Sequence, residues 1–128
     1  MNKEELIKKA LLYKRIIDWS KDKVTLEDGT TLEVECLDSD CCAWGNGEWD
    51  KVKLDAMITD VELTDVENLE DDDTRITTGL IKIYHNQNII AQNEMYTHAG
   101  NGGYYYSVTG LVVKLPDKNK LTGFVIEA

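Results

Sequence analysis

Three cysteines stand close together in the sequence, and their thiols could bind a metal. Cys36, Cys41 and Cys42 lie within seven residues, and together with imidazole and carboxylate groups thiolates suit zinc. Cys36 follows the alternation of a strand, so it is expected to be a small buried hydrophobe. Cys41 and Cys42 lie in a turn-rich stretch that packing explains less well. With Asp40 and His98 they form the predicted ligand set of a structural zinc site.

The same residues could also support nucleophilic catalysis. Cys42, His98 and Asn101 have the residue types of a thiol hydrolase, in which a base activates the thiolate. However, the acidic surroundings would raise the pKa of the thiol rather than lower it. The glycines at 100, 102 and 103 lack the lysine of a phosphate-binding loop and lead into an expected strand. We therefore expect no catalytic residues and no enzyme activity.

The acidic charge of the chain is concentrated in one segment. The net charge is −10, and Leu54 to Thr74 contains no Lys or Arg. The plain alternative is a solvated loop that aids solubility, but such a segment can also bind a partner. The acidic residues predicted to bind a partner are Asp60, Glu62, Asp65, Glu67, Glu70, Asp71, Asp72 and Asp73.

This charge distribution indicates the kind of partner. Direct nucleic-acid binding is disfavoured because it relies on Lys and Arg displacing counterions from phosphates. A protein with a basic surface is favoured, since complementary charge speeds encounter. Trp44 and Trp49 lie between turn residues and are predicted to be exposed anchors for that partner. The tyrosines at 104–106 are expected mainly to pack in a half-buried strand.

One helix is predicted at the N-terminus. Asn2 followed by Glu5 resembles a capping box, and apolar residues then recur at helical spacing. We expect a helix over Lys3–Tyr13, within a helical segment that covers residues 1–17. No continuous apolar run in this segment resembles a secretory signal.

A period of two dominates the remainder of the chain. Asp28-Gly29 predicts a hairpin turn, residues 37–50 are expected to be irregular, and an acidic loop is expected over residues 60–73. The predicted fold is α+β, with the N-terminal helix packed on a curved, mainly antiparallel sheet of about six to eight strands. The expected strands are Lys23–Glu27, Thr30–Cys36, Val52–Ile58, Arg75–Tyr84, Asn88–Tyr96, Tyr104–Leu115 and Leu121–Ile126. The strand pattern that begins at Val52 is also expected to continue with Val61 and Leu63.

Length and composition limit the number of domains, the possibility of a membrane span and the expected location. A chain of 128 residues fits a single domain, here residues 1–128 with a β-rich body over 22–128. No apolar run approaches the roughly 20 residues that span a membrane. The odd number of cysteines is a poor disulfide framework, so a reducing, cytoplasmic location is expected.

Two groups of motifs resemble a family of small phage and prophage domains without assigned activity. In that family an Asp-Gly hairpin is followed by Asp-Cys-Cys and later by Asn-Gly-Tyr-Tyr. The matching residues are Asp28-Gly29, Asp40-Cys41-Cys42 and Asn101 to Tyr105. This chain departs from the pattern in having an extra glycine before Tyr104.

Among small acidic phage proteins, the chain looks like a type II anti-CRISPR inhibitor. That resemblance implies binding to the RNA-guided nuclease Cas9 or its guide complex, which holds nucleic acid in positively charged channels. The inhibitor would block nucleic-acid loading or cleavage and would carry structural zinc. The alternatives are another phage-encoded protein-binding accessory module with a metal site, and a small thiol- or metal-dependent hydrolase.

Overall fold

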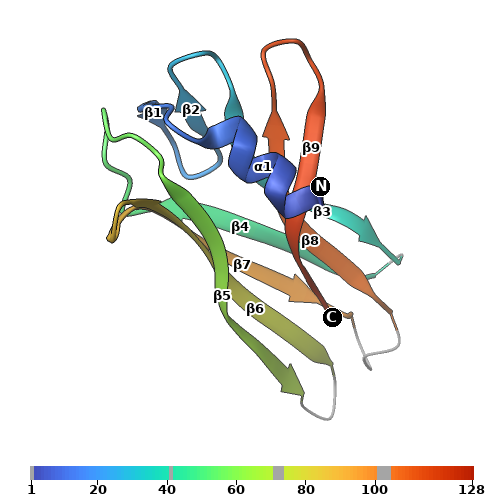
Figure 1. The fold of residues 1–128 in the computed structure, drawn as a ribbon. Helices are drawn as coiled ribbons and strands as arrows, with labels where there is room; N and C mark the ends of the chain where they lie inside the picture. The colour runs from blue at the N-terminus through green and yellow to red at the C-terminus, as the bar shows by residue number, and fades with distance from the viewer. Residues whose placement is uncertain (1, 41, 71–73, 101–104) are drawn as a thin grey trace.

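The computed structural model describes residues 2–40, 42–70, 74–100 and 105–128, which form one short helix and nine strands (Figure 1). The elements in chain order are α1 (Lys3–Leu11), β1 (Ile16–Trp19), β2 (Val24–Leu26), β3 (Thr31–Ser39), β4 (Trp44–Asp50), β5 (Asp60–Glu70), β6 (Arg75–His85), β7 (Asn88–His98), β8 (Ser107–Lys114) and β9 (Lys120–Glu127).

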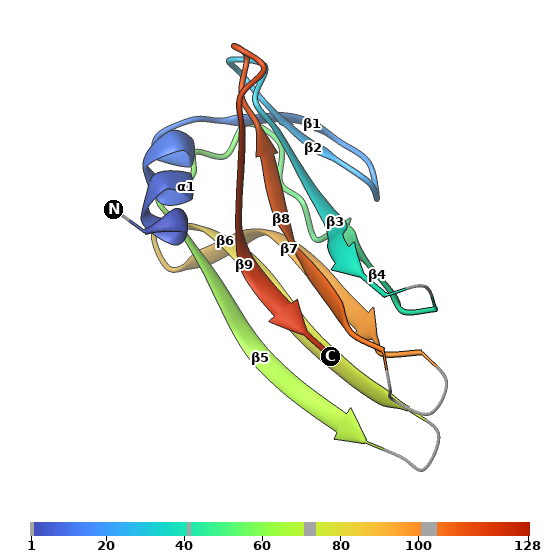
Figure 2. The ribbon, with the colours of Figure 1, turned by 90° about the vertical axis from the view of Figure 1, so that its right-hand side faces the viewer.

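The strands form two antiparallel sheets rather than the single sheet of six to eight strands that the sequence predicted. The five-stranded sheet has the order β1-β2-β3-β8-β9, and the four-stranded sheet has the order β4-β7-β6-β5. The chain changes sheets after β3 and again after β7. Figure 2 shows the two sheets packed at an angle, with the four-stranded sheet below the other. The predicted helix and antiparallel pairing are confirmed; the number of sheets and strands is corrected.

Helix α1 is shorter than predicted. The Asn2 side chain accepts a hydrogen bond from the Glu5 amide at 2.8 Å, which caps the first turn. The helix ends at Leu11 rather than at Tyr13, because Tyr13 has a φ of 66°. The Tyr13 amide then donates to the Ile58 carbonyl at 2.8 Å. The backbone thus leaves the helix to meet another segment, and residues 16–19 are a strand instead of helix.

Three other predicted segments also differ. Residues 37–50, expected to be irregular, contain the end of β3 and all of β4. Residues 52–58, expected to be a strand, form only an isolated bridge between Arg15 and Met57. The expected acidic loop is a strand from Asp60 to Glu70, and residues 71–73 lie outside the described part of the chain. The strand patterns predicted around the 28–29 turn and for β6, β7 and β9 are confirmed.

The core lies between the sheets and under α1. It includes Ile7 from the helix, Leu111 from one sheet, and Ile81 and Trp49 from the other. Two glycines of β4 let the sheets approach closely. A Cβ atom at Gly45 would lie 1.8 Å from Thr109 Oγ1 in the opposite sheet.

The Gly45 contact predicts a stability effect. Gly45→Ala should lower the free energy of unfolding by about 1–3 kcal/mol, because the added methyl overpacks the space between the sheets. Chemical denaturation measures this. The matched control is Asn46→Ala, which changes an exposed side chain on the same strand and should cost less.

A double mutant tests the cause. Removing the Thr109 hydroxyl with Thr109→Ala should recover part of the loss in the Gly45→Ala background. Equal losses in the two backgrounds would show that contact with Thr109 does not set the stability at this position.

Candidate binding surface

The outward side of the four-stranded sheet, here called the outer face, is open to solvent. Along β6, buried residues alternate with partly exposed ones, so Ile81 faces the core while Leu80 and Thr78 face outward. The same alternation in β4 buries Trp49 and exposes its neighbour Glu48.

The strand register arranges the outer face in three rows of cross-strand neighbours. Each row takes one residue from β4, β7, β6 and β5 in turn. The rows are Glu48–Glu94–Leu80–Thr64, then Asn46–Tyr96–Thr78–Glu67, then Trp44–His98–Ile76–Leu69. One end of the face is therefore aromatic and aliphatic, and the middle carries carboxylates.

Two carboxylates oppose each other in the first row. Glu48 and Glu94 are paired across β4 and β7, and both side chains are exposed. Like charges that lie directly opposite in a sheet are destabilising. A local conflict of this kind is expected where function, rather than stability, selects the residue.

Three rings form a cluster at the far end of the face. The ring centroids of Trp44 and His98 are 5.4 Å apart with an interplanar angle of 10°, and those of Trp44 and Tyr96 are 4.9 Å apart. Trp44 is still 46% exposed. This aromatic cluster offers a preformed apolar surface at the end of an acidic sheet face.

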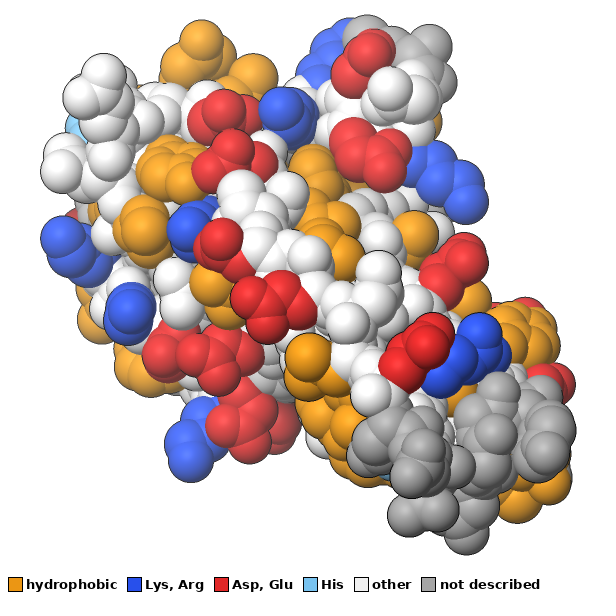
Figure 3. Space-filling view, turned by 90° about the horizontal axis from the view of Figure 1, so that it is seen from below, with side chains coloured by type: hydrophobic (Ala, Val, Ile, Leu, Met, Phe, Trp, Pro, Cys, Tyr) orange, Lys and Arg blue, Asp and Glu red, His pale blue; other side chains and the backbone are white. Residues whose placement is uncertain are grey.

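A groove of about 510 Å³ crosses the middle of the outer face. Its lining includes the carboxylates of Glu48, Asp65, Glu67 and Glu94, with no Lys or Arg among the described lining residues. Figure 3 looks toward this sheet from below and shows Asp and Glu side chains across the face, with some Lys or Arg side chains beside them and hydrophobic patches on both sides. The groove is therefore suited to a positively charged group.

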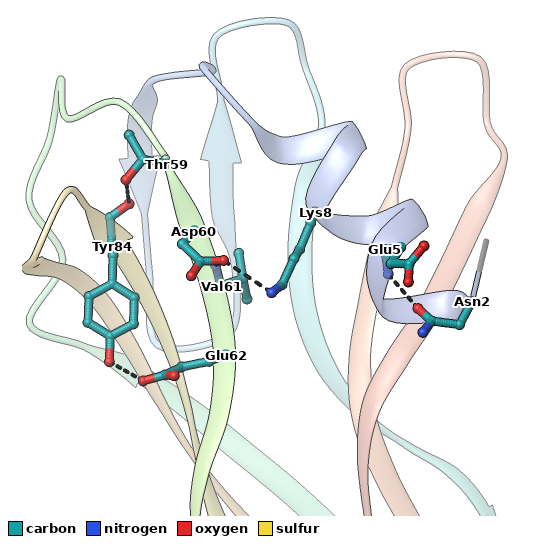
Figure 4. A network of polar contacts seen from close by, with 8 residues as sticks. All are labelled: Asn2, Glu5, Lys8, Thr59, Asp60, Val61, Glu62 and Tyr84. Atoms are coloured by element: carbon teal, nitrogen blue, oxygen red, sulfur yellow. Dashed lines mark hydrogen bonds and ion pairs between the residues drawn. The ribbon is translucent and has the colours of Figure 1, made fainter.

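The strand β5 distributes the predicted acidic residues among different partners. Asp60 lies 3.2 Å from Lys8 of α1, and Glu62 accepts a hydrogen bond from the Tyr84 hydroxyl (Figure 4). Asp65 sits at a bulge with a φ of 54° and lies 3.2 Å from Lys82. The acidic segment is thus not one continuous patch.

The remaining residues that were predicted to bind a partner lie in different places. Glu67 lines the groove and Glu70 ends β5, whereas Asp71, Asp72 and Asp73 lie outside the described residues. Trp44 belongs to the aromatic cluster. The expectation that Trp49 is exposed is wrong: it is 1% exposed, because strand alternation turns it into the core.

Hydrogen bonds shift the pKa values of two side chains, one on β6 and one on β5. The bond to Glu62, together with burial, raises the pKa of Tyr84 from 10.0 to about 12. The bond from Lys82, with a second from Thr64, lowers the pKa of the Asp65 carboxyl. The Lys82 ammonium that lowers this pKa also offsets the negative charge of Asp65.

The segments that carry the predicted zinc ligands lie next to each other. Those ligands that belong to the described residues do not converge on one point. Trp44 pairs with His98, and a Cβ atom at Gly100 would lie 2.9 Å from the Cys42 carbonyl. His98 Nδ1 accepts from the Gly100 amide at 2.9 Å, and Asp40 accepts from the Tyr106 amide at 3.0 Å. In the described part of the chain, no three His, Cys, Asp or Glu residues are grouped to hold a metal.

The positions of the three cysteines do not show whether zinc binds. Cys41 lies outside the described residues, Cys42 is exposed, and Cys36 is half-buried rather than fully buried. Zinc therefore stays a prediction. Elemental analysis of protein purified without added metal tests it: equimolar zinc that is lost in Cys42→Ser would support the site, and its absence in both would contradict it.

Sequence reasoning missed the β4 and β7 contribution to the outer face. Glu48, Glu94 and Tyr96 were not singled out. The signal was present, because Trp44, Asn46, Glu48 and Asp50 alternate with Gly45, Gly47 and Trp49. The two glycines made this segment resemble a loop. The acidic charge, in turn, indicated residues 60–73 as the binding segment.

These features define a mostly antiparallel, two-sheet domain with an N-terminal helix and an acidic outer sheet face. The model of the family described as Domain of unknown function (DUF7448) matches residues 9–112, and the chain belongs to this family. This match confirms the prediction that the chain belongs to a family of unknown function. Comparisons with curated proteins and with solved structures find no match.

The family match spans β1 to β7 and most of β8, so it includes the outer face. The N-terminal part of α1 and the whole of β9 lie outside the matched range. In the described residues, no helix has the length and apolarity to cross a membrane.

The Tyr84 contact predicts a titration. Glu62→Gln should lower the pKa of Tyr84 from about 12 toward 10.0, because the neutral amide no longer stabilises the protonated phenol. NMR of ring-labelled tyrosine, assigned with Tyr84→Phe, measures the change. An unaltered pKa in Glu62→Gln would contradict the hydrogen bond as its cause.

The raised pKa of Tyr84 also predicts how the free energy of unfolding depends on pH. The folded pKa of Tyr84 is above the ordinary value, so the contact contributes to stability below pH 10 and this contribution is lost as pH rises through about 12. The difference in unfolding free energy between wild type and Glu62→Gln should therefore shrink over that range.

Proposed function

We propose that this chain is a non-enzymatic binding domain that docks the outer face on a basic protein surface. One observation carries the proposal: Glu48 and Glu94 oppose each other beside a groove whose described lining has four carboxylates and no Lys or Arg. A cationic partner would relieve the repulsion between them, and that relief would add to the binding free energy.

Binding fits this surface better than catalysis. Carboxylates that act as general acid or base, or that stabilise a transition state, work best where water is excluded. Glu48 and Glu94 stand exposed on the outside of a sheet. Exposed aromatic groups next to charged ones are instead typical of interface anchors.

The partner that we propose is the type II RNA-guided nuclease. Its positively charged channel binds nucleic acid through the backbone, and an acidic sheet face could occupy that channel in place of phosphates. The chain would then act as a stoichiometric, phage-encoded inhibitor of guide or target loading. A different phage-encoded accessory module would use the same face on another basic protein.

Charge reversal tests the docking face. Glu94→Lys should weaken binding to the nuclease by about tenfold or more, since it places a like charge before a basic surface. The fold should tolerate the change, because Lys at this position faces Glu48. The matched control is Glu27→Lys, an exposed glutamate between β2 and β3 of the other sheet, with the same change in net charge.

Pull-down and cleavage assays at increasing salt measure this effect. Wild type and Glu27→Lys should bind and inhibit alike, with both effects falling as salt rises. Equal binding by Glu94→Lys would exclude the outer face. A nuclease that retains neither wild type nor control would exclude this partner.

A further inference from the structure

We infer that the groove receives an arginine side chain from an extended basic segment, while an apolar side chain two residues along that segment packs on the aromatic cluster. The inference rests on the proposed function, because it names the chemistry by which the outer face would bind its partner. It commits to one occupant, a segment that carries arginine.

The groove has the chemistry that a guanidinium group requires. Glu48 and Glu94 oppose each other on one side, and Glu67 lies across the sheet in the row of Tyr96. A guanidinium group forms paired, charge-assisted hydrogen bonds with carboxylates. Its planar surface can also stack on an aromatic ring such as that of Tyr96.

The aromatic cluster lies beside the groove and shares the middle row with it. Tyr96 belongs to both, since it lines the groove and its ring centroid is 4.9 Å from that of Trp44. Trp44 stands on β4, which is an edge strand among the described residues. Within the described part of the chain no second strand pairs with β4, and Trp44 is 46% exposed.

Arginine fits better than a metal ion. A hard cation needs several carboxylate oxygens that converge on one point, and no three acidic, His or Cys side chains of the described residues converge in that way. Asp65, moreover, is already engaged by Lys82 at 3.2 Å. Carboxylates spread around a groove suit the wide fork of a guanidinium group.

Arginine also fits better than lysine. A lysine ammonium is a compact and strongly hydrated charge, whereas a guanidinium group is flat and more weakly hydrated. Only the guanidinium can meet carboxylates with its edge while its face lies on the Tyr96 ring. The groove offers both kinds of contact within one sheet face.

Short peptides test the inference without any nuclease. The probe is the capped tetrapeptide Ala-Arg-Ala-Leu, compared with the same peptide carrying lysine or the neutral isostere citrulline. Binding is followed by NMR on the Trp44 indole N–H and on the Glu94 and Tyr96 amides. The arginine peptide should shift these signals with an affinity about tenfold above that of the citrulline peptide.

Isosteric variants identify the carboxylates. Glu94→Gln should weaken the arginine peptide by about tenfold through loss of one charge-assisted pair. The same change should leave the melting temperature unchanged or raise it, because it removes the like-charge pair with Glu48. Glu27→Gln, an exposed glutamate between β2 and β3 of the other sheet, should alter neither. A loss of affinity that accompanies a loss of fold would be visible in the melting temperature.

Each contrary outcome has a separate meaning. Equal binding of the arginine, lysine and citrulline peptides, or equal shifts with calcium chloride alone, would overturn the arginine site. No peptide binding with a nuclease that is still retained would overturn the inference and leave the proposed function standing. Arginine-specific binding by a chain that does not retain the nuclease would support the groove and contradict the proposed partner.

Discussion

The pairing of β4 with β7 is the constraint on which the outer face depends. In this register Trp44 lies beside His98 and Glu48 beside Glu94. A slip of one residue would turn all outward side chains of β4 into the core. Trp49 and the two glycines make that slip costly, because the indole fills the core while Gly45 and Gly47 admit side chains from the opposite sheet. The core therefore holds the groove and the aromatic cluster in place.

The position of β4 also explains why its outward side chains remain available. Among the described residues, β4 pairs with one strand only, β7, while the Trp49 amide on its other side donates to the Lys21 carbonyl at 2.9 Å. Edge strands that carry charge resist pairing with other strands, and Glu48 supplies that protection. Its placement opposite Glu94 goes beyond protection, because a positive residue there would protect the edge without repulsion. This surplus of negative charge is the feature that a basic partner would neutralise.

The sequence allowed the local structure to be predicted where turns and alternation agreed. Asp28-Gly29 marked a real hairpin, and the alternation around Ile81 and Ile83 marked a real strand. Prediction was wrong where these signals conflicted. Glycines at 45 and 47 resembled a loop because their role, the close approach of a second sheet, is a tertiary effect. The acidic residues of β5 resembled a loop because a bulge at Asp65 interrupts the alternation.

The candidate site was predictable only in part for the same reason. Charge in a single segment is visible in a sequence, whereas carboxylates brought together from β4, β5 and β7 are visible only after folding. The acidic character that composition indicated is therefore best described as a property of a sheet face. Of the acidic residues expected to bind a partner, Asp60 and Asp65 form ion pairs. Glu48 and Glu94, from β4 and β7, also line the groove.

Oxidative footprinting, with and without a bound type II nuclease, tests the central claim most directly. Trp44 and Trp19 have similar exposure, 46% and 39%, but lie in different sheets. The account predicts that binding protects Trp44 and Tyr96 from hydroxyl radicals and leaves Trp19 and Tyr13 as reactive as before. Protection of Trp19 with an unprotected Trp44 would contradict docking through the outer face.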